Sequence, residues 1–225
     1  ADIYGPSIPI MFDLVGARPQ SSEINGKTKI TPIEKYGIKL LSMGFFTDPN
    51  QPVPWRGPMV STAVKQLFND ADWGELDYLV VDLPPGTGDI HITVTQSFPI
   101  AGAVIVTTPQ KVAMADTKKG IGMFLMEAIN VPILGIIENM SYFTPAELPN
   151  NKYYIFGKNG GKSLADDYKT PFLGEIPLVQ SISEAGDAGQ PIILQENNPM
   201  ANAFSELAQK VAQQIAIQNE KAKTA

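Results

Sequence analysis

The sequence holds 225 residues, of which 44% are hydrophobic, enough to form a buried core. Its 17 Lys and Arg against 23 Asp and Glu give a net charge of -6, opposite in sign to a surface that binds nucleic-acid phosphates. Because the chain has no Cys and only 1 His, disulfides, thiolate metal sites and cysteine nucleophiles are excluded, and any metal ion should be held by oxygen ligands, as Mg²⁺ is.

The chain also shows no targeting or membrane pattern. No stretch approaches the roughly 20 apolar residues that span a bilayer, and the start lacks a basic region followed by an apolar one. We therefore expect a cytoplasmic protein without a membrane or nucleic-acid partner.

The first part of the chain predicts extended segments followed by a helix. Asn25-Gly26 is a turn dipeptide, and residues 27–46 after it favour extended structure. Apolar residues then recur at spacings of three and four, which predicts a helix with these residues on one face: Val60, Val64, Leu67 and Phe68.

Four apolar or β-branched runs bounded by turn residues are typical of strands buried on both faces. They are residues 78–81, 103–107, 132–137 and 172–176. Helical patterns separate them, one with Ile121, Phe124, Leu125 and Ala128 on a face, and a last helix begins after Asn198 as N-cap, with Pro199 first. Strands that alternate with helices predict an α/β fold, a doubly wound and mainly parallel sheet, in one domain over residues 1–225.

The strongest local signal is YLVVDLPPGTGD, residues 78–89. The apolar run places Asp82 at the C-terminal tip of a strand, where ligands bind in open α/β sheets. A carboxylate there can hold the Mg²⁺ of a nucleotide directly or through water, and Gly86 and Gly88 let the backbone approach a γ-phosphate. The alternative is a helix-capping Asp in an ordinary β–α turn.

Two further residues are candidates for the same site as Asp82. Asp2, in ADIYGPS, precedes Gly5 and Pro6, which alone indicates only a turn. Paired with Asp82, it suits one metal ion and one attacking water. Asn139 ends the run VPILGIIEN, and its carboxamide offers a donor and an acceptor that match the edge of adenine, although a turn-forming Asn is an equal alternative.

Residues 156–164, FGKNGGKSL, look like a phosphate-binding loop but lack its spacing. A Walker A motif has four residues between its first Gly and its Gly-Lys pair, whereas Gly157 and Gly161 are separated by three. We expect a helix-entry turn here.

Taken together, these motifs resemble the Mrp/ApbC family of iron-sulfur cluster carrier ATPases, within the MinD/ParA-like group of P-loop NTPases. The resemblance covers essentially the whole chain and is carried by DIYGPSIP, WRGPM at 55–59, DLPPGTGD at 82–89, TTPQ at 107–110 and ENMSYF at 138–143. It implies a P-loop α/β domain that forms a homodimer around two ATP molecules and acts with iron-sulfur client or assembly proteins.

The resemblance also implies roles for single residues. Asp2 would be the acid near the attacking water, Asp82 the acid on Mg²⁺ and Asn139 an adenine contact. Residues 84–89 would form the switch II loop. The positions that would contact the nucleotide or its phosphates, besides Asn139, are Gly5, Pro84, Pro85, Gly86 and Gly88.

The sequence departs from the family pattern in two places. The family's glycine-rich loop precedes the strand that ends at Asp2, so we expect the first strand, the P-loop and the first helix to lie upstream of Ala1, and ATP binding by this chain alone to be poor. We expect the missing strand between the strands that end at Asp2 and Asp82. The Cys-x-x-Cys pair that many members carry after ENMS is replaced by TPAELPNNK, which puts a resident cluster in doubt because its ligation needs sulfur.

The sequence therefore predicts an ATP-binding and ATP-hydrolysing iron-sulfur cluster carrier or assembly factor in the intact protein. The alternatives are a MinD/ParA-like positioning ATPase and a non-catalytic interaction module. Among weaker signals, Trp55 and Arg56 are residue types common at interfaces, and His91 is expected at the surface or at a helix start. Asp116 and Lys118 are helix-surface charges or contacts to the nucleotide of a partner subunit.

Overall fold

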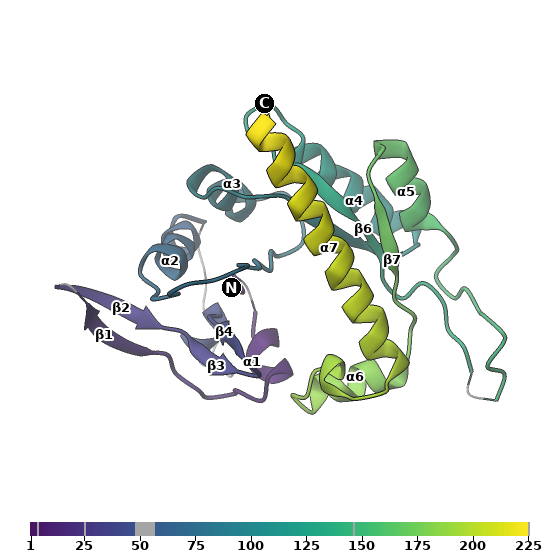
Figure 1. The fold of residues 1–225 in the computed structure, drawn as a ribbon, viewed down its shortest axis with the longest axis horizontal. Coiled ribbons are helices and arrows are strands. Elements are labelled where there is room, and N and C mark those ends of the chain that lie inside the picture. Colours follow the sequence, from purple (N-terminus) through teal and green to yellow (C-terminus); the bar gives the residue numbers. More distant parts are fainter. Residues whose placement is uncertain (4, 25, 48–56, 146, 225) are drawn as a thin grey trace. The chain divides into compact units, whose positions relative to one another are not determined.

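The computed structural model describes residues 1–3, 5–24, 26–47, 57–145 and 147–224. Trp55 and Arg56, expected at an interface, lie outside the described residues. The chain divides into two compact units, Ala1–Phe98 with Ala185–Pro191, and Pro99–Glu184 with Ile192–Ala225. Their elements are labelled in Figure 1. The expectation of a single domain stays a prediction.

The first unit combines short antiparallel hairpins with helices. Helix α1 (Ser7–Met11) is followed by β1 (Gln20–Ile24) paired with β2 (Lys27–Thr31), and by β3 (Ile33–Lys35) paired with β4 (Ile38–Leu40). The 3-10 turn η1 (Met43–Phe45) and helices α2 (Gly57–Asn69) and α3 (Asp89–Ser97) complete it. The extended segments and the helix predicted from the first part of the chain are confirmed.

The core of the first unit lies between the hairpins and α2. Leu41, Met43, Leu67 and Ala71 form a buried cluster. Residues 185–191 also belong to this unit, and the hydroxyl of Tyr36 donates to the Gly189 carbonyl at 3.0 Å across a separation of 153 residues.

The strand predicted over residues 78–81 is wrong. Tyr78, Leu79 and Val80 are 57%, 40% and 77% exposed, and only Asp82 forms an isolated bridge, with Asp2. A run of this kind becomes a buried strand only when neighbours pair along its edges. In the described part of the chain, its hydrogen-bonded neighbour is the short segment that starts at Ala1.

Exposure of this apolar run predicts self-association, because an unpaired extended segment can pair with another molecule. Val80→Lys should lower the association of the chain and change its stability by no more than about 0.5 kcal/mol, since the side chain is 77% exposed. Light scattering over a concentration series measures the effect. Val112→Lys, at a 79% exposed position of the second unit, is the matched control, and equal association of both variants would contradict the prediction.

The second unit contains a parallel sheet in the order β5 (Ala103–Thr107), β6 (Ile133–Glu138), β7 (Phe172–Glu175). Its helices are α4 (Lys111–Phe124), α5 (Gly160–Tyr168) and α7 (Pro199–Thr224), with the 3-10 turn η2 (Ile192–Leu194). Helix α6 (Gln180–Asp187) begins in this unit, and its residues from Ala185 onward belong to the first unit. These strands match the predicted runs 103–107, 132–137 and 172–176. The predicted parallel α/β architecture is confirmed here.

Helix α7 lies across the sheet of this unit, as Figure 1 shows. Leu207 packs against Leu173 and Ile176. The side chain of Asn198 accepts a hydrogen bond from the Met200 N–H at 2.8 Å, which confirms the predicted N-cap. No helix within the described ranges is long and apolar enough to cross a membrane.

Helix α4 is shorter than its apolar pattern suggested. Phe124 is its last residue, so Leu125 and Ala128 lie beyond it, and Leu125 is 52% exposed. Repeated apolar spacing does not show where a helix ends, because the last turn depends on how its carbonyls are capped.

Candidate functional site

Asp2 is held rigidly by its neighbours in the first unit. The residue is 4% exposed, and its Oδ2 accepts a hydrogen bond from the Ser42 hydroxyl at 2.6 Å. The Ser42 oxygen in turn accepts from the Gly44 N–H at 2.9 Å, at the start of η1. The Asp2 backbone is bonded to the Leu41 carbonyl and the Met43 N–H, so both its backbone and its carboxylate are fixed.

Asp2 and Asp82 lie side by side. They form a parallel bridge in which the Asp82 N–H donates to the Ala1 carbonyl at 2.8 Å and the Ile3 N–H donates to the Asp82 carbonyl at 3.3 Å. The expectation of a further strand between them is wrong for this structure, because the two backbones already bond to each other. Unlike Asp2, Asp82 has an exposed side chain. The structure thus brings together the two acids predicted to share a metal ion and a water.

The loop that follows Asp82 has an open surface. Gly86 has φ 103, a conformation that favours glycine, and Gly88 is the N-cap of α3. No heavy atom lies within 4 Å of the position that a Cβ would take on either glycine. Pro84 is half-buried and Pro85 is exposed. Gly5, after Asp2, likewise has a positive φ of 107.

His91 was expected at the surface or at a helix start, and it lies in the first turn of α3. The residue is buried there, with 4% of its surface exposed. The burial of His91 could have been predicted from Val94, because residues three apart lie on the same helix face and an apolar Val94 marks the buried face. Burial lowers the pKa of His91, and the backbone carbonyls of Pro84 and Gly88 oppose this shift.

Asn139 lies in the second unit, directly after β6. Its N–H donates to the Thr107 carbonyl at 2.7 Å, and its side-chain Oδ1 accepts from the Met140 N–H at 2.9 Å. Met140 has φ 51, so Asn139 forms a turn here. Its role as an adenine contact stays a prediction.

Glu138 is a buried acid that sequence reasoning missed. Its side chain is 0% exposed, and its carboxylate accepts from the Ser141 hydroxyl at 2.6 Å and from the Gly161 N–H at 2.5 Å. The signal was a Glu at the end of an otherwise apolar run, because a buried carboxylate requires hydrogen-bond donors. Glu138 therefore occupies the N-terminus of α5.

Residues 156–164 are the helix-entry turn that the spacing predicted. Asn159 adopts the left-handed conformation and α5 begins at Gly160. A Cβ on Gly160 would lie 2.7 Å from Cα of Pro109, and one on Gly161 would lie 2.9 Å from Cβ of Glu138. The two glycines therefore serve close packing, and the Glu138 carboxylate accepts the Gly161 N–H at the start of α5.

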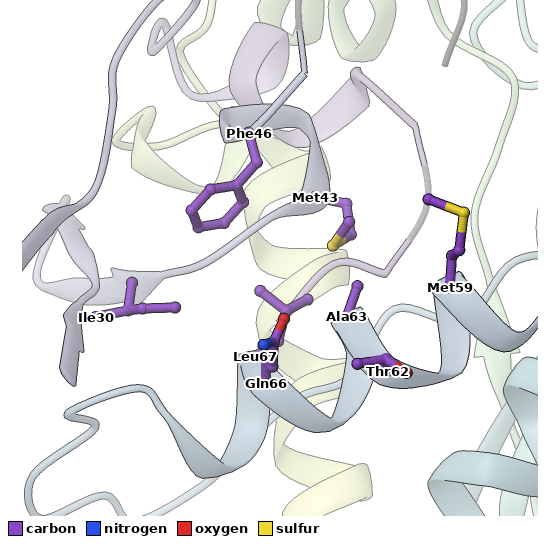
Figure 2. Close-up of a pocket in the computed structure, with 8 residues that line it drawn as sticks. All are labelled: Ile30, Met43, Phe46, Met59, Thr62, Ala63, Gln66 and Leu67. Atoms are coloured by element: carbon purple, nitrogen blue, oxygen red, sulfur yellow. The ribbon is translucent and has the colours of Figure 1, made fainter. Parts of the chain in front are cut away.

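A cavity of about 570 Å³ lies in the first unit, along α2 (Figure 2). Its lining residues are Ile30, Met43, Phe46, Met59, Thr62, Ala63, Gln66 and Leu67. The lining includes no charged side chain and none of the predicted site residues, so it does not fit a triphosphate.

Asp116 forms an exposed ion pair with Lys119, and Lys118 forms another with Asp167, at 3.5 Å each, as helix-surface charges do.

The residues present fit Mg²⁺ with a nucleotide but not an iron-sulfur cluster. The described residues contain no group of three or more carboxylate or histidine side chains that would hold a metal ion alone. Mg²⁺ commonly needs only one or two carboxylates, with phosphate oxygens and water completing its shell. Thiolate ligation of a cluster is excluded, because the chain has no Cys.

Comparisons with known proteins agree with this geometry. A family model described as ParA: NUBPL iron-transfer P-loop NTPase matches residues 1–212. An iron-sulfur cluster carrier protein of Synechocystis sp. is 46% identical over 218 residues, 96% of this chain and 61% of that protein. The iron-sulfur cluster transfer protein NUBPL of Dictyostelium discoideum is 44% identical over 220 residues, 97% of this chain and 66% of that protein.

One solved structure is similar in fold and sequence. A nucleotide-binding protein of Archaeoglobus fulgidus, in complex with ADP, superposes with a TM-score of 0.71 at 33% identity, covering 90% of this chain and 76% of that one. The chain spans less than two thirds of the length of the two curated relatives, at 61% and 66%.

Proposed function

Since the chain belongs to the family of NUBPL-type iron-transfer P-loop NTPases, we propose that the protein binds and hydrolyses ATP with Mg²⁺ and acts as an iron-sulfur cluster carrier or assembly factor. The bridge between Asp2 and Asp82 carries this proposal, because it places two carboxylates together beside an open glycine loop. The carrier relatives and the ADP-bound structure support it.

We assign each residue near the phosphates of the nucleotide a separate role. The exposed Asp82 would hold Mg²⁺ directly or through water. The bound ion would neutralise charge on the phosphate oxygens. Asp2, fixed by Ser42, accepts a hydrogen bond from the attacking water and orients it. The N–H groups of Gly86 and Gly88 donate to the γ-phosphate, which is the positioning and charge stabilisation that phosphoryl transfer requires.

The glycine-rich loop that cradles phosphates in such enzymes is not found among the printed residues. We propose that a segment outside these 225 residues supplies it, so that the present chain alone binds ATP poorly. The same reasoning applies to the cargo. Because this chain has no Cys, any cluster would be held by ligands from another protein, such as a client or assembly protein. We further propose that the protein acts as a homodimer in the cytoplasm.

A titration with a fluorescent ATP analogue and Mg²⁺ tests this function. It compares the present chain with a version extended upstream in its own reading frame. Only the extended version should bind, and in it Asp82→Asn should lower the rate of ATP hydrolysis by about 100-fold or more, because the ligand of Mg²⁺ is lost. Asp72→Asn, at another exposed acid of the first unit, is the matched control.

The two other outcomes have clear meanings. An extended version that binds no nucleotide would support a non-catalytic interaction module. Tight binding by the present chain would place the nucleotide away from Asp2 and Asp82.

A further inference from the structure

The chain between β6 and α5 carries an exposed hairpin that the proposed reaction does not use. Phe143 and Tyr153 form an antiparallel bridge, in which the N–H of each residue donates to the carbonyl of the other at 2.8 Å. We call residues 142–145 and 147–158 the aromatic hairpin. In Figure 1 this part of the chain extends away from the sheet of the second unit.

The base of the aromatic hairpin is fixed to the second unit at both ends. The Leu178 N–H donates to the Tyr142 carbonyl at 2.8 Å. At the other end, a Cβ on Gly157 would lie 3.3 Å from the carbonyl oxygen of Pro109, so the two backbones are closely packed. A surface on a fixed base has less conformational freedom to lose when a partner binds.

One face of the bridge presents aromatic rings to solvent. Because residues that face each other across two strands point to the same side, Phe143 and Tyr153 share this face. They are 36% and 46% exposed, and Leu148 and Ile155 of the same hairpin are 47% and 59% exposed. Exposed apolar groups gathered in one place indicate a protein-binding surface, and aromatic side chains are its usual anchors.

The neighbouring pair of the hairpin holds two cations. The rings of Tyr142 and Tyr154 lie 6.4 Å apart, with Lys152 Nζ 3.7 Å from the centre of the first ring and Lys158 Nζ 4.6 Å from the centre of the second. Cation–π contacts of this kind restrain the ammonium groups without neutralising their charge. Within the described ranges neither lysine forms an ion pair, so both can pair with carboxylates of another molecule.

The charge of the hairpin is opposite to that of the chain as a whole. Residues 142–158 contain Lys152, Lys158 and Glu147, hence a net charge of +1, whereas the whole chain carries -6. An acidic partner is therefore attracted to the hairpin and repelled by the rest of the chain. A second copy that paired through the same face would bring like lysines together, which disfavours that arrangement.

We propose that the aromatic hairpin is a docking surface for an acidic segment of a client protein, in which Asp and Glu flank apolar side chains. Phe143 and Tyr153 contact the apolar side chains of that segment, while Lys152 and Lys158 pair with its carboxylates. That the partner is an iron-sulfur client rests on the proposed function, whereas the preference of the surface for acidic and apolar groups does not.

Fluorescence anisotropy of the present chain, with no nucleotide added, tests this preference. The probe is a short labelled peptide in which Glu alternates with Phe and Leu. We expect saturable binding that weakens by about tenfold between about 0.05 and 0.5 M NaCl, because salt screens exposed charges. The same peptide with Lys in place of each Glu should bind at least about tenfold more weakly.

Removing one ring tests the aromatic face. Tyr153→Ala should weaken binding of the acidic peptide by at least about tenfold, as loss of an aromatic anchor does. Its backbone bonds to Phe143 do not depend on the ring, so its thermal unfolding should match that of the wild type. Tyr78→Ala, at a 57% exposed tyrosine of the first unit, is the matched control and should bind as the wild type does.

Reversing the two charges tests the cations. The double variant Lys152→Glu, Lys158→Glu should bind the Lys peptide more tightly than the Glu peptide, because the attraction is inverted. A merely structural role of the lysines would not invert this preference. Lys221→Glu, at an exposed position near the end of α7, is the control and should keep the preference of the wild type.

Four results would overturn the proposal: no binding of the acidic peptide, equal binding of both peptides, wild-type binding by Tyr153→Ala, or tighter binding of a single-stranded RNA oligonucleotide. Lower self-association of Tyr153→Ala without peptide binding would assign the face to a second copy instead. If Tyr153→Ala does not fold, the charge reversal decides. Because no step uses nucleotide, failure of the ATPase proposal gives a different result from failure of this one.

Discussion

Replacing Gly160 with alanine is expected to destabilise the second unit by about 3 kcal/mol. The new Cβ would lie 2.7 Å from Cα and 2.8 Å from the carbonyl oxygen of Pro109, and 2.7 Å from the sulfur of Met114. The Met114 side chain can move at low cost, but the Pro109 backbone cannot. The loop after β5 and the start of α5 would therefore have to separate.

Urea unfolding of the variant measures this change in free energy. Gly120→Ala, on α4, is the matched control because no heavy atom lies within 4 Å of its new Cβ. That substitution should stabilise the chain by up to about 1 kcal/mol, since alanine is the better helix former. If both variants shifted the free energy of unfolding equally, close packing would not be the reason for glycine at position 160.

Replacing Glu138 with glutamine should cost about 2 kcal/mol, because one of the two donors that face its carboxylate loses its acceptor. Those donors are the Ser141 hydroxyl and the Gly161 N–H, at 2.6 and 2.5 Å. Glu138→Leu should cost more, because both donors would then be buried without a partner.

Thermal and urea unfolding measure this effect, and amide exchange at Gly161 locates it. Faster exchange at Gly161 is expected in Glu138→Leu, where its acceptor is gone, whereas in Glu138→Gln the exchange rate shows which of the two donors keeps the amide oxygen as its acceptor. Glu127→Gln, at an exposed position, should change the stability by no more than about 0.5 kcal/mol. A Glu138→Gln variant as stable as that control would show that the buried carboxylate contributes no net stability.

The contrast between residues 103–107 and 78–81 shows what a sequence pattern can predict. Both are apolar runs bounded by turn residues, and both favour extended structure. The first became β5, although its Val106 is 58% exposed, whereas the second formed no strand and its Val80 is 77% exposed. Burial on both faces depends on neighbouring strands and covering helices, and a run of residues carries no information about them.

The candidate site was predictable where its chemistry is local. Asp82 and its glycine loop are contiguous, so turn chemistry and the end of an apolar run identified them. Ser42, which holds Asp2, is 40 residues from it in sequence and could not be linked to it by spacing. His91 lies in the first turn of α3, one of its two expected places, but its burial was not foreseen, because a helix pattern does not show what packs against it.

The first unit is built from two separate parts of the chain, and this affects when it can fold during synthesis. Its Tyr36 hydroxyl bonds to Gly189, so the unit cannot be completed until residues 185–191 have left the ribosome. In the second unit, strands that are consecutive in the chain pair with each other, which keeps the separation of contacting residues small. The second unit in turn needs α7, whose Leu207 is part of its core, so neither unit is expected to reach its native structure until most of the chain has been translated.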